Sequence, residues 1–287
     1  MELFARWDSR TQRWIFYICN AEKPTVSETC RYCIKRYKGG TVISSNMFFK
    51  DSGRYVIGSI AEYKEKFRRI SFPVCVKEKA IIIDSKHEPL TEIPRSAIYR
   101  SLVSVFREVN KMLVREKYDR IIVTSQSGIV NEGTLSHPHF RLFALNLGPI
   151  NLSSEKIFTI SNDDIVYENT HFRLINPFVR DFVFDLRIIG KHSRINAHEP
   201  KRFMDSFLDV FLKGIEILED IPFQAVLDFK NDNVFYVRFA SDNKLYPWPL
   251  SAFQIANFPI LLGDLDDVDS RIKYYLTRRE KVGEIIE

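Results

Sequence analysis

The sequence of 287 residues predicts an α+β protein made of two tandem repeats, with antiparallel sheets and helices packed on them. Two observations support this prediction. An order of apolar strand, Lys-His dipeptide, amphipathic helix, strand, turn and strand occurs twice along the chain. In the expected helices, the apolar positions also recur with the spacing of a helical turn. We place the repeats at residues 1–160 and 161–287.

The first copy of this order starts with an apolar strand at residues 79–84, which the dipeptide Lys86-His87 follows. A helix then begins at Pro94, because proline is favoured in the first turn of a helix. Strands at residues 120–124 and 137–146, joined by a turn that contains glycines, complete the unit. Apolar residues recur along the helix at Ile98, Leu102, Val105, Phe106, Val109 and Leu113.

The second copy has a strand at residues 182–189, then Lys191-His192 and a helix from about Pro200. Strands at residues 224–229 and 234–239 follow, and the intervening residues 230–233 are typical of a hairpin turn. The apolar helix positions are Phe203, Phe207, Val210, Phe211 and Ile215. We therefore expect two copies of one unit, packed side by side.

The composition, 45% hydrophobic and 28% charged, is that of a globular protein. No run approaches the ~20 apolar residues that a membrane-spanning helix needs, and the charged N-terminal residues do not form a signal peptide. We therefore expect a cytoplasmic protein without membrane contacts. The net charge of +5 suits an anionic substrate such as a nucleotide, although so mild an excess is also typical of an ordinary solvated surface. A nucleic-acid partner is not expected.

Two histidines, His137 and His139, mark the segment that says most about function. In an extended strand, alternate side chains share a face, so these two imidazoles and the guanidinium of Arg141 would point the same way. Gly128 and Gly133 in the preceding turn would let backbone amides approach an anion closely. Such a face can bind a metal, hold a phosphate or attack one.

Cys30 and Cys33 form a Cys-x-x-Cys pair that could place two thiolates on one tetrahedral metal ion. The chain has no second pair of this kind, so two of its six histidines would have to complete a zinc site. A pair of reduced thiols without a metal is the alternative.

Four segments, taken in order, resemble motifs of one known family. Residues 6–14 resemble its Arg-x-Asn-Pro-x-Thr-x-x-Trp strand, and Cys30 to Cys33 resemble its Cys-x-x-Cys. Residues 87–93 resemble its His-x-x-x-Leu-x-x-Leu, and residues 126–141 its Asn-x-Gly-x-x-x-Gly-x-Ser-x-x-His-Pro-His-x-Gln. The chain thus resembles a divergent member of the galactose-1-phosphate uridylyltransferase family, within the histidine-triad superfamily of nucleotidyl transferases and hydrolases.

The resemblance implies a histidine-triad-like N-terminal repeat that carries the zinc site and the His-Pro-His motif, and a degenerate C-terminal repeat. It implies that His139 attacks the α-phosphate of a nucleotide sugar and carries the nucleotidyl group as a phosphoramidate. It also implies a structural zinc ion as the cofactor, and a set of substrate-binding residues. The implied zinc ligands are Cys30, Cys33, His87 and His137, and the implied substrate-binding residues are Arg6, Asn46, Gln126, Gly128, Gly133 and Thr134.

The sequence departs from the family's motif near the reacting phosphate. Arg141 stands where the family has a glutamine that donates to the transferred phosphoryl group, and Gln126 stands where it has an asparagine. A guanidinium could stabilise the developing charge or hold the covalent intermediate so firmly that turnover stalls. The strand at residues 234–239 has no histidine, so we expect the second metal site of many relatives to be absent.

Several functions remain open at this point. The first is a nucleotidyltransferase acting on a nucleotide sugar or another nucleotide-activated small molecule. A phosphorylase or hydrolase of the same superfamily is the second, and a catalytically inactive, zinc-stabilised nucleotide-binding protein is the third. Relatives commonly pair, so a homodimer is a further expectation.

Overall fold

The structure is a computed structural model of the whole chain. It describes residues 2–8, 13–19, 39–44, 71–73, 75–84, 86, 88, 90–127, 137–147, 161–178, 184–191, 201–218, 221, 223–230, 235–241, 256 and 260–262. The helical elements are α3 (Arg95–Asn110), the π-helical turn η1 (Lys111–Arg115), the 3-10 turn η2 (Asn162–Asp164) and α4 (Lys201–Ile217). The strands are β1 (Glu2–Asp8), β2 (Arg13–Cys19), β3 (Val42–Ser44), β4 (Ser71–Pro73), β5 (Cys75–Ile82), β6 (Arg120–Ser127), β7 (His139–Asn146), β8 (Ile165–Glu168), β9 (Phe172–Ile175), β10 (Phe184–Gly190), β11 (Phe223–Lys230), β12 (Phe235–Ser241) and β13 (Ile260–Leu262).

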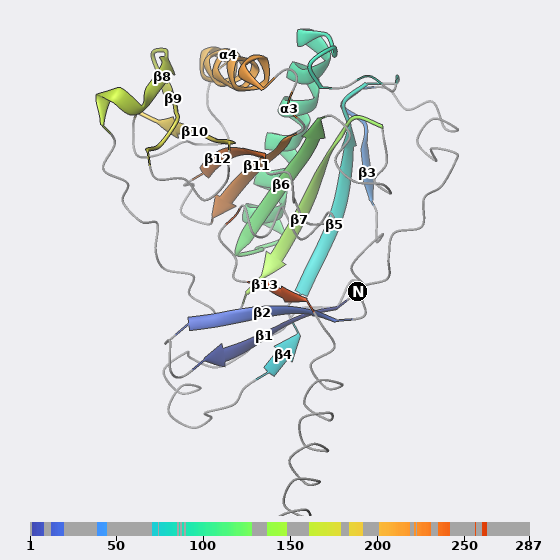
Figure 1. The fold of residues 1–287 in the computed structure, drawn as a ribbon. Helices are drawn as coiled ribbons and strands as arrows, with labels where there is room; N and C mark the ends of the chain where they lie inside the picture. Colours follow the sequence, from blue (N-terminus) through green and yellow to red (C-terminus); the bar gives the residue numbers. More distant parts are fainter. Residues whose placement is uncertain are drawn as a thin grey trace, which may run out of the picture.

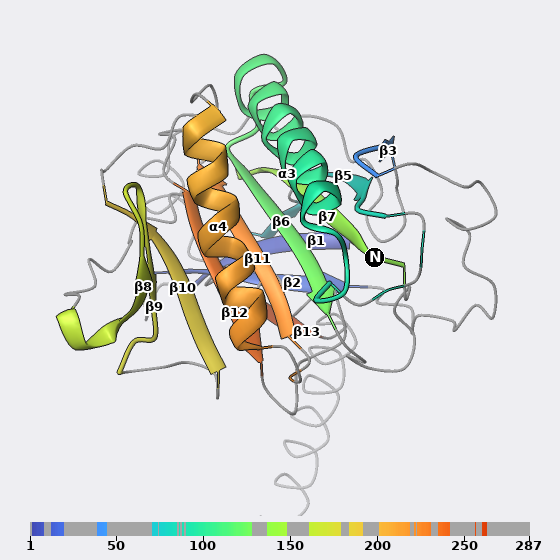
Figure 2. The same ribbon diagram turned by 90° about the horizontal axis from the view of Figure 1, so that it is seen from above.

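Nine of these strands form one antiparallel sheet in the order β3-β5-β7-β6-β11-β12-β10-β9-β8. The pairing of β6 with β11, from Phe223 opposite Ser127 to Lys230 opposite Arg120, makes the sheet continuous from one half of the chain to the other. Helices α3 and α4 lie side by side on one face of this sheet (Figures 1 and 2).

The helices form where the apolar spacing predicts them. Helix α3 begins directly after Pro94, and α4 buries the phenylalanines of its inner face against the sheet. Gly214 of α4 marks the closest approach, because a Cβ atom there would come within 2.6 Å of the ring of Phe239 on β12. Apolar side chains of the two helices and of the inner sheet face form one continuous buried cluster. Burial of this apolar surface is the main stabilising contribution to the fold.

A four-stranded sheet, in the order β13-β2-β1-β4, lies on the opposite side of the large sheet from the helices (Figure 2). Strands β1 and β2 form an antiparallel hairpin, and β13 pairs with β2 in parallel, so segments from both ends of the chain share this sheet. A buried arginine of the large sheet also contacts Ala256, four residues before β13. Arg120 on β6 binds Asp228 on β11 through Nε and Nη2, and its Nη2 also donates to the carbonyl oxygen of Ala256 at 2.8 Å.

The predicted α+β class with helices packed on antiparallel strands is confirmed. The large sheet, however, is one continuous layer, and the four-stranded sheet was not predicted. Each of the six strands predicted in the two units is present, with ends that differ by at most four residues; β7, for example, begins at His139 rather than at 137. The division at residues 160 and 161 stays a prediction. Within the described residues, no helix is long and apolar enough to cross a membrane.

Candidate functional site

The face of the large sheet that points away from the helices carries a group of buried polar residues. Alternation along β7 explains why, because Phe140 and Leu142 join the core beneath the helices while His139 and Arg141 point to the other side. We call this side the polar face. Its buried members include Glu78, Thr124, Arg141, Asp185, Arg187, Gln224, Asp228 and Arg238.

His137 is buried at the entry to β7, where it contacts the end of β5. Its Nε2 donates a hydrogen bond of 2.8 Å to the carbonyl oxygen of Asp84. A backbone hydrogen bond joins the same two segments, because the amide of Ile83 donates to the carbonyl of Pro138 at 3.0 Å. The amide of Leu90 in turn donates to Ser127 Oγ at the end of β6, at 3.2 Å. Asp84 and Leu90, which flank His87 in the sequence, therefore bind His137 and the end of β6.

His139 is the first residue of β7, and its ring is oriented by the backbone. Nδ1 lies 2.7 Å from the carbonyl oxygen of His137. Because a carbonyl can only accept, Nδ1 carries the proton, and the neutral ring then has its lone pair on Nε2. The hydroxyl of Ser125 on β6 donates to the carbonyl of His139 itself, at 3.1 Å. The strand, the ring plane and the tautomer of His139 are therefore all set by local hydrogen bonds.

Arg141 does not extend into solvent from the histidine face. Its Nε donates to Oε1 of Glu78 on β5 at 2.5 Å, and both side chains are almost completely buried. The contact is diagonal. Ala80 lies opposite Arg141, whereas Glu78 lies opposite Phe143, which is two residues farther along β7 from His139. The guanidinium that the sequence predicts near the substrate phosphate is therefore already paired with the carboxylate of Glu78.

Two glutamines lie next to each other at the centre of the polar face, Gln126 on β6 opposite Gln224 on β11. Nε2 of Gln224 donates to the hydroxyl of Thr124 at 2.6 Å. Nε2 of Gln126, in contrast, is buried without a hydrogen-bond partner in the described part of the chain. A buried amide without a partner costs about 1–3 kcal/mol. An acceptor on a bound molecule would therefore satisfy this amide.

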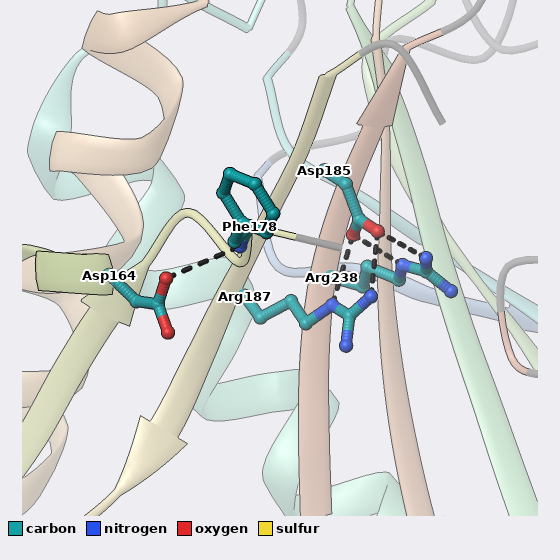
Figure 3. A network of polar contacts seen from close by, with 5 residues as sticks. All are labelled: Asp164, Phe178, Asp185, Arg187 and Arg238. Atoms are coloured by element: carbon teal, nitrogen blue, oxygen red, sulfur yellow. Dashed lines mark hydrogen bonds and ion pairs between the residues drawn. The ribbon is translucent and has the colours of Figure 1, made fainter. Parts of the chain in front are cut away.

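A second ionic cluster lies on the polar face of the C-terminal half. Asp185 on β10 lies between two arginines, and both carboxylate oxygens accept from Arg187 on the same strand and from Arg238 on β12 (Figure 3). Burial alone would raise the pKa of Asp185, but the hydrogen bonds and charges of Arg238 and Arg187 outweigh it and hold that pKa below its ordinary value. Nearby, Asp164 accepts from the backbone amide of the exposed Phe178 at 3.2 Å (Figure 3).

The structure brings together His137, His139, Arg141 and Gln126 of the predicted site. For Arg6 it describes only the backbone, which pairs with Ile15 in the β1–β2 hairpin. The other predicted residues lie outside the described part of the chain: Cys30, Cys33, Asn46, His87, Gly128, Gly133 and Thr134. No group of three metal-ligating side chains occurs among the residues that the structure describes. Zinc and its three further ligands stay a prediction.

Sequence reasoning did not find Glu78, Gln224 or Asp185. Gln224 and Asp185 are polar residues next to apolar ones in their strands, and this pattern is a weak signal. Glu78 lies between two lysines, so it is easily interpreted as part of a solvated charge run. Asp185 and Arg187 are two positions apart on one strand, which places opposite charges on the same face. That spacing could have predicted their ion pair.

The sequence matches no protein-family model and no curated protein. Solved structures do match. A uridylyltransferase aligns with a TM-score of 0.63 at 14% identity, over 97% of this chain and 99% of that one. A GALT-like protein from Arabidopsis thaliana aligns with a TM-score of 0.55 at 14% identity, over 91% and 94%. An ADP-glucose phosphorylase from the same plant, with bound ADP-glucose, aligns with a TM-score of 0.51 at 15% identity, over 83% and 89%. The predicted resemblance is thus confirmed for the fold.

Proposed function

We propose that this protein is a nucleotidyltransferase of the galactose-1-phosphate uridylyltransferase type, with His139 as the nucleophile. One observation carries the proposal, the 2.7 Å hydrogen bond from Nδ1 of His139 to the carbonyl of His137. It keeps the proton on Nδ1 and the nucleophilic lone pair on Nε2, as covalent catalysis by a neutral imidazole requires. The fold shared with uridylyltransferases supports it independently.

The chemistry would proceed in two displacements. In the first, Nε2 of His139 attacks the α-phosphorus, a P–N bond forms, and the P–O bond to the leaving group breaks with its electron pair on oxygen. The ring then bears a positive charge, which the carbonyl of His137 stabilises through the proton retained on Nδ1. In the second, an oxygen of the acceptor phosphate attacks phosphorus, and the P–N bond breaks. Its electron pair returns to Nε2, which restores the neutral ring.

The substrate proposed is a nucleotide sugar or a related nucleotide-activated small molecule. The polar face supports this assignment, because Gln126 offers a buried amide donor beside the strand of His139. An ADP-glucose phosphorylase is among the proteins with this fold, so transfer to inorganic phosphate is the second candidate. Dependence of nucleotide release on added hexose phosphate or on inorganic phosphate separates these two reactions.

We also propose a structural zinc ion held by Cys30, Cys33, His87 and His137. The contacts of His137 suit this role, since a histidine ligand commonly donates its other ring N–H to a backbone carbonyl. With Nε2 of His137 bonded to Asp84, the metal would bind through Nδ1. The ion would hold the entry to β7 in place and thereby the carbonyl that orients His139.

The two halves are proposed to be histidine-triad-like repeats. The order strand, helix, strand, strand is the same in β5, α3, β6, β7 and in β10, α4, β11, β12. The sheet order β5-β7-β6-β11-β12-β10 is symmetric about its centre. An ion pair also recurs. In each half, an arginine of the last strand binds a carboxylate on the first strand. Arg141 lies opposite Ala80 and binds Glu78, two residues earlier; Arg238 lies opposite Arg187 and binds Asp185, also two residues earlier.

The decisive experiment is intact-mass spectrometry after brief incubation with a panel of nucleotide sugars and dinucleoside polyphosphates at neutral pH, which preserves the acid-labile phosphoramidate. We expect a mass gain of one nucleoside monophosphate in the wild-type protein and none in His139→Ala. His171→Ala is the matched control, because His171 binds Ser206 on α4, away from β7. A wild-type protein that consumes no substrate and forms no adduct would instead be a nucleotide-binding protein without catalysis.

A further inference from the structure

The ion pair between Arg141 and Glu78 lies close to the reacting group of the proposed reaction. Arg141 follows His139 by two residues on the same face of β7, a separation of about 7 Å along a strand. A phosphoryl group on Nε2 of His139 is therefore within the electrostatic range of the guanidinium. At that range a single charge in a partly desolvated site changes binding and rates severalfold or more.

Glu78 limits this influence in two ways. It lies opposite Phe143, so it draws Nε of Arg141 away from the end of the strand where His139 lies. Its carboxylate also compensates the charge of the guanidinium, since both side chains are at most 4% exposed. Removal of this carboxylate would add one net positive charge beside the dianionic or monoanionic groups that bind at His139.

We propose that Glu78 is a positioning residue that acts through Arg141 and keeps the nucleotidylated form of His139 from being held too tightly. The inference rests on the proposed function of His139. Strand β5 then controls both sides of the nucleophile. Asp84, two residues after its end, binds His137, and Glu78 within it binds Arg141. Glu78 would thus allow an arginine to stand two residues after the nucleophile without stalling turnover.

The C-terminal half provides a matched control for this role. Asp185 has the same diagonal relation to Arg238 that Glu78 has to Arg141, and it is equally buried. It lies on β10, which is separated from β7 by β12, β11 and β6. Loss of either carboxylate should therefore destabilise the fold, whereas only loss of Glu78 should alter events at His139.

The test compares Glu78→Gln, Asp185→Asn, Arg141→Gln and the double variant Glu78→Gln/Arg141→Gln. Glutamine keeps an acceptor for Nε of Arg141 but removes the negative charge. We expect the nucleotidylated form of Glu78→Gln to decay about tenfold more slowly after substrate removal, while Asp185→Asn decays at the wild-type rate. The double variant, in which neither charge remains, should recover a rate close to that of the wild-type protein.

Affinity for inorganic phosphate, measured by calorimetry, gives a second readout that does not depend on turnover. It should rise about tenfold in Glu78→Gln and stay unchanged in Asp185→Asn. If Glu78→Gln does not fold, Arg141→Gln and the double variant provide the same comparison, because they differ only in the carboxylate of Glu78. Arg141→Gln, which keeps this carboxylate, should bind phosphate more weakly than the double variant. Equal adduct lifetimes and equal phosphate affinities across these proteins would overturn the role of Glu78. Absence of an adduct in the wild-type protein would instead overturn the function proposed for His139.

Discussion

Gln126 and Gln224 lie opposite each other on β6 and β11, but their substitutions should affect different properties, substrate binding for Gln126 and stability for Gln224. We predict that Gln126→Leu does not lower the free energy of unfolding, because Nε2 of Gln126 has no described partner to lose. The same change should raise KM severalfold, since the amide would donate to the substrate. Gln224→Leu, in contrast, removes the donor to Thr124 and should cost about 1 kcal/mol of stability. Urea denaturation and steady-state kinetics measure both quantities, and a clear loss of stability in Gln126→Leu would contradict the assignment.

Where a motif carries them, candidate site residues could be proposed from sequence. His139 and Gln126 were proposed in this way, and the structure places them on the adjacent strands β7 and β6, with His137 just before β7; their roles stay predictions. The partner of Arg141 was not predictable, because Glu78 lies 63 positions away and meets it only through the register of β5 with β7. Pairing registers depend on hydrogen bonds between distant segments, which a single sequence does not display.

Strand β5 and the start of β7 are the elements that a structural zinc ion would stabilise most. We predict one zinc per chain in the purified protein, lost in Cys30→Ser and Cys33→Ser but retained in Cys75→Ser. The melting temperature should fall by about 10 °C on metal removal, because a structural ion contributes several kcal/mol and each kcal/mol corresponds to about 2–4 °C in a protein of this size. Adduct formation at His139 should be lost as well, since His137 then loses its fixed position.

Elemental analysis and calorimetry with and without a chelator test this prediction. Protein purified without chelator that contains no stoichiometric metal would favour the alternative, a pair of reduced thiols at Cys30 and Cys33.

Both long helices and the six central strands of the large sheet were within reach of the sequence. The four-stranded sheet and the short strands β3, β8 and β9 were not predicted. Pro94 and the apolar spacing after it located α3, and β-branched apolar runs located β6 and β10. Their exact ends differ because cross-strand hydrogen bonds, rather than local composition, decide where a strand stops.

The arrangement of the whole molecule was the least predictable level. The two predicted units could have formed two separate sheets, and the sequence contains no local sign that Gln224 pairs with Gln126 across the centre. The same holds for the parallel contact of Leu261 with Tyr17, which joins segments from both ends of the chain. Such contacts between remote residues are determined by the packing of the complete chain.

One sheet through both halves makes the ionic cluster of the C-terminal half important for the stability of the whole molecule. Removing one partner of a buried ion pair costs about 3–5 kcal/mol, and Asp185→Asn leaves two arginines without their shared carboxylate. We therefore expect a loss of that size at neutral pH. The loss should depend on pH in a definite direction. The pKa of Asp185 is lowered in the folded protein from its ordinary value of 3.8, so its ionised form stabilises the fold above pH 3.8.

As the pH falls below 3.8 towards the lowered pKa of Asp185, the stabilisation that its ionised carboxylate gives to the folded protein is progressively lost. The difference in unfolding free energy between the wild-type protein and Asp185→Asn should therefore shrink in that window. Glu168→Gln is the control, because hydrogen bonds from Lys191 and Arg173 also lower the pKa of Glu168 but its side chain is solvent-exposed. Solvent screens such exposed pairs, so this variant should unfold almost like the wild-type protein at every pH. Urea denaturation between pH 2.5 and 7, in steps of about half a unit, measures all three proteins, and a difference for Asp185→Asn that is constant across this range would refute the linkage.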